Sequence, residues 1–187
     1  MVVLNPRDQP FLRSYISLEE ACRVANAGGI DIVSNIILEG VYGFHNANYA
    51  FGTFIRSDCT HVFLSADDMI FPSDIILRLV TDDKDIIGGL YRTRDLSRIQ
   101  PAVYAPDADQ FLEDLKIGGV KECEYAPGHT MLVKREVLEK IIKDKPELEY
   151  INLHTNETEW AFFLPMLINK RMFMDDWAFS IRAKESG

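Results

Sequence analysis

The sequence has few cysteines, and their number and spacing exclude two common uses of the thiol group. Only three of the 187 residues are cysteine, namely Cys22, Cys59 and Cys123. No two of them are close enough in sequence for a Cys-x-x-Cys metal knuckle, and an odd number completes no disulfide framework. We therefore expect reduced and mostly buried thiols.

Basic residues and long apolar runs are also scarce. The chain has 20 Lys and Arg residues against 29 Asp and Glu, and its formal net charge is -9. This charge argues against a nucleic-acid partner, because such partners are held largely by Lys and Arg that neutralise phosphates. No apolar run approaches the roughly 20 residues that cross a bilayer, and the start of the chain lacks a secretory pattern. We expect a soluble, cytoplasmic protein with no transmembrane segment.

Three sequence motifs of common enzyme classes are missing as well. The sequence contains no Gly-x-Gly-x-x-Gly after a strand, no Gly-x-x-x-x-Gly-Lys-Ser/Thr loop and no Gly-x-Ser-x-Gly elbow. Their absence argues against a dinucleotide-dependent dehydrogenase, a P-loop enzyme and an α/β-hydrolase esterase.

The residues that are present predict one α/β domain. A hydrophobic content of 47% over 187 residues suits a single buried core. Strand-like apolar runs alternate with segments of helical period, which is typical of a layered α/β fold. We expect strands at 2–4, 30–38, 61–64, 85–89, 102–104, 122–125 and 130–133, and helices at 18–26, 41–57, from 72 onward, 135–143 and 177–184. Ser17 and Glu20 form the pattern of a capping box before the first helix.

Two acids follow the short apolar strand predicted at 61–64. Asp67 and Asp68 would lie at the carboxyl end of a central strand, where open α/β sheets bind their ligands. One or two carboxylates together with substrate phosphates are a common ligand set for Mg²⁺ or Mn²⁺. Alternatively, the two acids form a solvent-exposed turn in which Asp caps the following helix, and the sequence favours neither interpretation.

Other polar residues leave a functional and a structural interpretation open. Asp175 and Asp176 precede a predicted helix, so they either cap its N-terminus or join the first acidic pair as a general base. Gly128 permits a close backbone approach and His129 could bond a hydroxyl or phosphate, although a lone His is more often structural. Asn46 and Asn48 would ordinarily be exposed polar positions of their helix.

Four segments together resemble the GT-A glycosyltransferases, especially those of family 2. Residues 60–72 resemble the strand, Asp-x-Asp turn and Pro-started helix of that family, and residues 85–92 resemble its next strand and loop. Residues 126–133 resemble its Gly-containing segment, and residues 175–179, Asp-Asp-Trp-Ala-Phe, resemble its Glu-Asp-Trp catalytic motif. The resemblance covers most of the chain and extends to a small viral member. It implies a GT-A fold with a mixed, mostly parallel central sheet flanked by helices. If the chain is viral, the expected location is the cytoplasm of the host cell.

The resemblance also implies roles for individual residues. Asp68, beside Asp67, matches the last acid of the Asp-x-Asp turn, which binds a divalent cation, Mn²⁺ or Mg²⁺, that bridges the donor phosphates. Asp176, helped or replaced by Asp175, matches the base that deprotonates an acceptor hydroxyl in inverting members. The implied donor-binding residues are Pro6, Arg7, Asn46, Ser65, Ala66, Gly128 and His129.

The sequence departs from the family pattern at several positions. Ala66, or Ser65 in a shifted alignment, replaces the first acid of the turn, and His45 replaces an expected Arg. The chain ends at Gly187, where relatives usually add strands, so we expect residues 1–187 to form a minimal or C-terminally truncated catalytic domain.

The expected activity is sugar transfer from a nucleotide-diphosphate sugar to an unknown acceptor, with a glycoprotein as one option. Two alternatives remain: a non-catalytic module of the same fold that binds nucleotide sugars or protein, and a nucleotidyltransferase.

Overall fold

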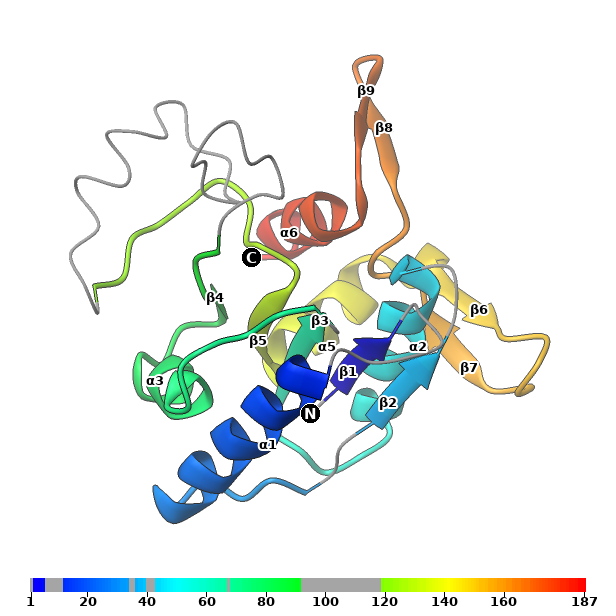
Figure 1. Ribbon diagram of the computed structural model, residues 1–187. Helices are drawn as coiled ribbons and strands as arrows, with labels where there is room; N and C mark the ends of the chain where they lie inside the picture. Colours follow the sequence, from blue (N-terminus) through cyan, green and yellow to red (C-terminus); the bar gives the residue numbers. More distant parts are fainter. Residues whose placement is uncertain (1, 6–11, 34–35, 40–42, 67, 92–118) are drawn as a thin grey trace.

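The computed structural model describes residues 2–5, 12–33, 36–39, 43–66, 68–91 and 119–187 (Figure 1). The strand predicted at 102–104 lies outside these residues. In the described part of the chain, no helix has the length and apolar character that a membrane span needs.

A five-stranded mixed sheet forms the centre of the fold. Its strands are β1 (Val2–Asn5), β2 (Ile36–Glu39), β3 (His61–Ala66), β4 (Ile86–Gly88) and β5 (Thr130–Lys134), in the order β2-β1-β3-β5-β4. β1 is parallel to β2 and β3, whereas β5 is antiparallel to both of its neighbours, β3 and β4. The predicted α/β class is confirmed. The expectation of a mostly parallel sheet is not met among these strands, because only the β2-β1-β3 half has parallel pairing.

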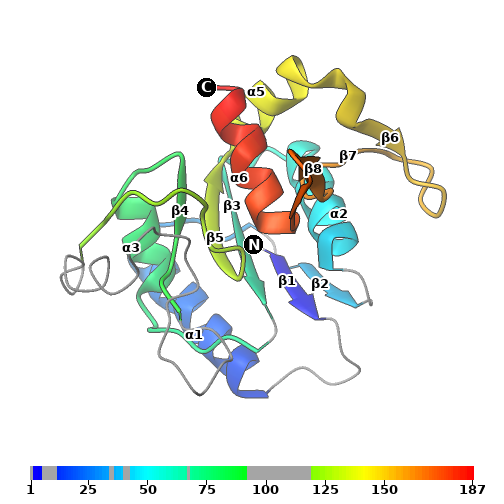
Figure 2. The same cartoon turned by 90° about the horizontal axis from the view of Figure 1, so that it is seen from above.

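Helices cover both faces of this sheet (Figure 2). They are α1 (Leu12–Ala27), α2 (Gly43–Ile55), α3 (Ile75–Thr81), α5 (Arg135–Asp144) and α6 (Asp175–Glu185). Strand side chains alternate between the faces. Phe63 and Leu132 therefore pack with α1 and α3, while their neighbours Val62 and Val133 pack with α2, α5 and α6. The two apolar clusters fix the sheet between two helical layers.

The first helix differs from its prediction. α1 begins at Leu12, ahead of the expected start, so Ser17 lies inside the helix and does not cap it. The Ser17 hydroxyl instead donates to the Phe71 carbonyl and accepts the Phe71 N–H, each at 3.0 Å. This serine ties α1 to the segment between β3 and α3. Two of the predicted strands also differ, since residues 30–33 and 122–124 form no strand.

Two antiparallel hairpins were not predicted. The first joins β6 (Glu149–Ile151), which follows a 3₁₀ turn at Pro146–Leu148, to β7 (Thr158–Trp160). The second joins β8 (Met166–Ile168) to β9 (Arg171–Phe173) and stands away from the body of the molecule (Figure 1). It leads directly into α6.

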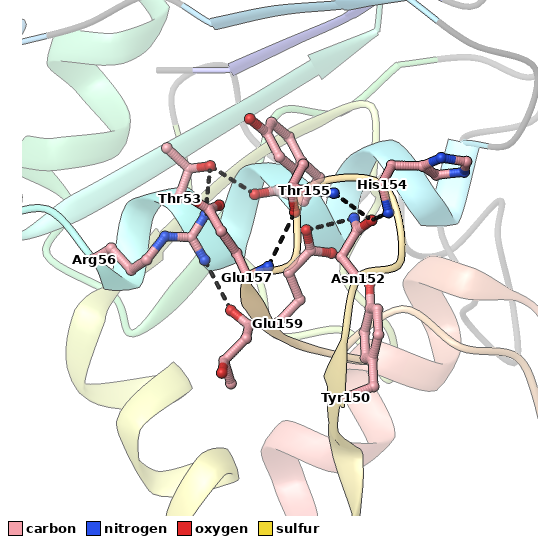
Figure 3. A network of polar contacts seen from close by, with 10 residues as sticks. Thr53, Arg56, Tyr150, Asn152, His154, Thr155, Glu157 and Glu159 are labelled. Carbon is pink, nitrogen blue, oxygen red and sulfur yellow. Dashed lines mark hydrogen bonds and ion pairs between the residues drawn. The ribbon is translucent and has the colours of Figure 1, made fainter.

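A buried carboxylate fastens the first hairpin together. Glu159 is fully buried, and it accepts hydrogen bonds from the Tyr150 hydroxyl at 2.6 Å and the Asn152 amide at 2.7 Å (Figure 3). Directly after α2, Arg56 donates to the Thr158 carbonyl at 2.8 Å and pairs with Glu157 at 2.7 Å. The cluster therefore holds β6 and β7 against α2, and its donors satisfy the buried acid.

A single guanidinium secures the end of α2. Arg135, at the start of α5, donates to the carbonyl oxygens of Phe54, Ile55, Ser57 and Cys59 at distances of 2.6 to 3.1 Å. These carbonyls are among the acceptors that a helix C-terminus leaves free, and a cation is favourable there. The three cysteines form no disulfide, as predicted; Cys22 is buried and the other two are half-buried.

Candidate functional site

The site lies at the carboxyl edge of the parallel strands. β1 pairs with β2 on one side and β3 on the other, and Leu4 of β1 is in register with Ala66 of β3. After β1 the chain adds β2 on one side of β1 and then β3 on the other side, so the strand order reverses between β1 and β3. The space outside the carboxyl ends of strands at such a switch point is where open α/β sheets bind ligands. The acidic turn after Ala66 begins at this place.

The antiparallel direction of β5 brings a distant segment to the same edge. Because β5 starts where β3 ends, Ser65 is paired with Thr130, and the Ala66 N–H donates to the His129 carbonyl at 3.2 Å. β4 ends here as well, since the Gly89 N–H donates to the Thr130 carbonyl at 2.8 Å. Tyr91, two residues further, thus lies beside His129.

The N-terminus of α6 completes the site with its two acids. Asp175 and Asp176 are the first residues of this helix, where the helix dipole favours negative charge. Asp176 Oδ2 accepts the Gly128 N–H at 3.1 Å, and Oδ1 accepts the Trp177 N–H at 2.9 Å. A Cβ added to Gly128 would stand 2.7 Å from the Asp176 Cβ. Only glycine allows the backbone to approach this carboxylate so closely.

Burial makes Asp176 a stronger base than a free aspartate. Desolvation raises the pKa of its carboxyl group, and the negative charge of Asp175 raises it further. The two backbone N–H donors and His129 oppose this rise. Such a balance is typical of acid–base residues, whose pKa is moved toward the working pH by burial and a like charge.

Tyr91 belongs to the site although the sequence did not indicate it. Its ring stacks on His129 with centroids 5.4 Å apart, and its oxygen accepts the His129 N–H at 3.4 Å. Burial, with contributions from the charges of Asp176, Asp175 and Asp68, raises the pKa of Tyr91 to about 12. The hydroxyl is therefore protonated at neutral pH. The same charges show that the acidic turn and the α6 acids share one electrostatic environment.

The structure brings together some of the predicted site residues and leaves others apart. The charges of Asp68, Asp175 and Asp176 raise the pKa of Tyr91, His129 stacks on its ring, and Gly128 donates to Asp176. Pro6, Arg7 and Asp67 lie outside the described residues.

Ser65 and Ala66 form the end of β3 itself. Ser65 is 1% exposed and its hydroxyl donates to the neighbouring Ala66 carbonyl at 3.2 Å. Its hydroxyl is thus used within the strand.

The expectation that Asn46 and Asn48 are exposed is wrong. Asn46 is 7% exposed and Asn48 is 4% exposed, because α2 is covered on more than one side. The Asn48 side-chain oxygen accepts the Phe163 N–H at 2.9 Å, whereas the Asn46 amide nitrogen has no hydrogen-bond partner in the described structure. A buried amide without a partner is costly, so Asn46 is not an ordinary surface residue.

A metal site made of protein ligands alone is not formed by the described residues. Among them, no group of three or more His, Cys, Asp or Glu side chains could hold a metal ion. A cation at the acidic turn would therefore need ligands from a substrate beside Asp68, a mode that Mg²⁺ commonly uses with phosphates.

Comparisons with known proteins give one distant structural relation. No protein-family model matches the chain, and no curated protein matches it. The crystal structure of A197 from STIV is similar with a TM-score of 0.48 and 16% sequence identity. The match covers 74% of this chain and 66% of that one. This relation establishes neither a GT-A family membership nor an activity for the chain.

Proposed function

We propose that the chain is a GT-A glycosyltransferase that transfers a sugar, with inversion, from a nucleotide-diphosphate sugar to an acceptor hydroxyl. The observation that carries the proposal is the carboxylate of Asp176, half-buried at the N-terminus of α6 and oriented by the Gly128 N–H. It lies at the switch-point edge of the sheet, in one electrostatic environment with Asp68. The fold type and the assignment to the family rest on the sequence resemblance.

Asp176 acts as the general base in this proposal. Its carboxylate takes the proton of the acceptor hydroxyl while the oxygen attacks the anomeric carbon of the donor sugar. The bond from that carbon to the diphosphate oxygen breaks, and the nucleoside diphosphate leaves with the electron pair. The backbone donors fix the orientation of the carboxylate, and the adjacent Asp175 strengthens it as a base.

Asp68 and Asp67 would hold a divalent cation, Mn²⁺ or Mg²⁺, beside the donor diphosphate. The cation would supply charge stabilisation for the leaving diphosphate. Asp68 is one carboxylate, and phosphate oxygens would provide further ligands. Ala66 provides none, so the two acids of the turn are adjacent in sequence, whereas those of an Asp-x-Asp turn are separated by one residue. The neutral hydroxyl of Tyr91 could donate a hydrogen bond to a diphosphate oxygen here.

A donor-binding module without turnover is the second candidate. Ala66 at the position of the first acid and the lack of a described three-ligand group favour it. A nucleotidyltransferase differs from both, because it would release pyrophosphate and not a nucleoside diphosphate.

Calorimetric titration with UDP- and GDP-linked sugars, with and without Mn²⁺, tests the proposal. We expect Mn²⁺-dependent binding that Asp68→Ala removes. Asp58→Ala is the matched control, because Asp58 is an exposed acid just before the start of β3, at the opposite end of the strand. Binding followed by release of nucleoside diphosphate supports transfer, and binding without release supports the module. No binding of any donor by folded protein contradicts both.

A further inference from the structure

The β8–β9 hairpin exposes apolar side chains to an unusual degree. Leu167 and Met172 form a cross-strand pair and are 70% and 59% exposed, and Met174, just after β9, is 56% exposed. The hairpin stands away from the sheet and the other helices in Figure 1, and Figure 2 shows it nearly end-on beside α6. A single two-stranded hairpin is marginally stable in water unless its apolar face is covered.

The strands of this hairpin do not alternate between polar and apolar residues. The opposite face from Leu167 and Met172 carries Met166, Ile168 and Phe173, which are half-buried, together with the exposed Arg171. A hairpin with one face on a protein core and one in water normally alternates. The face of Leu167 and Met172 is therefore an apolar face that the described structure leaves exposed.

The turn presents two cations. Lys170 and Arg171 are exposed, and within the described structure neither forms a salt bridge. Asn169 and Lys170 have φ angles of 50° and 64°, as in a two-residue hairpin turn. Glycine would adopt the left-handed conformation of Lys170 at less cost. The turn therefore keeps a cation where its backbone geometry favours glycine.

The base of the hairpin is fixed. The Phe173 ring lies 6.0 Å from that of Tyr125 and 6.4 Å from that of Trp177, measured between centroids. Trp177 belongs to the first turn of α6. The aromatic contacts hold the hairpin in one orientation relative to α6, so its exposed end is presented as a defined surface.

We propose that the β8–β9 hairpin docks the protein on the surface of an anionic lipid bilayer. Leu167, Met172 and Met174 enter the boundary between headgroups and acyl chains, and Lys170 at the turn binds lipid phosphates, while Arg171 on the opposite face adds positive charge close to the membrane surface. The hairpin lies along the interface, because tip-first insertion would bury both cations.

Charge favours a bilayer over a second copy of the chain. The whole chain has a formal net charge of -9, so an anionic membrane would attract it only through a locally basic segment such as this turn. A second copy docking through the same hairpin would offer the cations no acid, since residues 166–174 contain none.

Flotation with liposomes tests the proposal without any nucleotide sugar, so its outcome is independent of the proposed function. We expect binding to vesicles of phosphatidylcholine with about 30% phosphatidylserine, weaker binding to pure phosphatidylcholine, and loss in high salt. Lys170→Gly should weaken binding about fivefold. Because glycine relieves the backbone strain of this turn, the weaker binding would be due to the lost charge and not to unfolding. Leu167→Thr with Met172→Thr should weaken it about tenfold.

Leu153→Ser is the matched control, because Leu153 is 95% exposed in the loop of the other hairpin. Its binding should equal that of the unaltered protein. The proposal is overturned if anionic vesicles do not bind the protein, or if Leu153→Ser weakens binding as much as the β8–β9 variants. A dimer in light scattering that Leu167→Thr with Met172→Thr dissociates, without vesicle binding, would assign the hairpin to a second copy and also overturn it.

Discussion

Replacing Gly128 with alanine tests whether the approach of this backbone to Asp176 matters for function. The added Cβ would stand 2.7 Å from the Asp176 Cβ and 3.2 Å from Oδ2. Carbon atoms normally pack at about 3.5 to 4.0 Å, so the carboxylate or the start of α6 must move by about 1 Å. Gly128 does not have a positive φ, so alanine strains no backbone conformation there.

Two magnitudes follow from this clash. Overpacking at a well-packed position costs about 1 to 3 kcal/mol of stability. A misplacement of about 1 Å in a catalytic group can cost about 10²-fold in rate. We therefore expect Gly128→Ala to remain folded, to bind the donor sugar nearly as well as the unaltered protein, and to release nucleoside diphosphate about 10²-fold more slowly.

Gly29→Ala serves as the matched control. Gly29 has a φ of +88°, and no atom lies within 4 Å of an added Cβ. The cost of this substitution to stability is therefore conformational, about 1 kcal/mol, and Gly29 lies outside the site. Urea unfolding measures both stabilities, and nucleoside diphosphate release measures both rates. Equal rates in the two variants, at comparable stability, would refute the role of the Gly128 contact.

Three further predictions concern single side chains. Asp176→Asn should lower turnover about 10²- to 10⁴-fold, with donor affinity unchanged in titration. Because the pKa of Asp176 is raised in the folded protein, the stability that its carboxyl group contributes is present below the unfolded pKa and is lost as pH rises through the folded pKa. Urea unfolding should therefore show the unaltered protein losing stability relative to Asp176→Asn over that pH window. Tyr91→Phe keeps the stack on His129 and removes a neutral hydroxyl, so unfolding should change by no more than about 1 kcal/mol while donor affinity falls about tenfold. Arg135→Met leaves the carbonyls at the end of α2 without their cation and should cost about 2 to 4 kcal/mol in urea unfolding, with donor binding unchanged because Arg135 lies at the opposite edge of the sheet.

The regular core of the fold could be predicted because local pattern and tertiary packing agree there. The apolar run at 130–133 and the amphipathic segment after it became β5 and α5 almost at the predicted bounds. Ser17 misled the prediction, since its hydroxyl suits a helix cap and equally suits Phe71, a residue 54 positions away. Nothing in a local sequence pattern distinguishes these two partners.

The β8–β9 hairpin was missed for a related reason. Its turn uses Asn169 and Lys170 in left-handed conformations without a glycine to indicate them. Its strands also lack the alternation that normally marks a half-buried strand. Short apolar runs of this kind do not specify their structure by themselves.

The positions of the acids in the candidate site could be predicted from the sequence, but their contacts could not. The place of Asp68 after a buried strand and of Asp176 at a helix start follows from local pattern. The contacts of Gly128 with Asp176 and of Tyr91 with His129 depend on the antiparallel direction of β5, which sequence periodicity does not report. The role proposed for each acid stays a prediction.

The hydrogen bond between Gly128 and Asp176 joins residues 48 positions apart, and this separation affects how the site comes into being during folding. Closing such a loop costs entropy. β1, β3 and β5 all precede α6 in the chain, so synthesis makes them first. The site is therefore complete only after residues 175–185 have been made and lie against this edge.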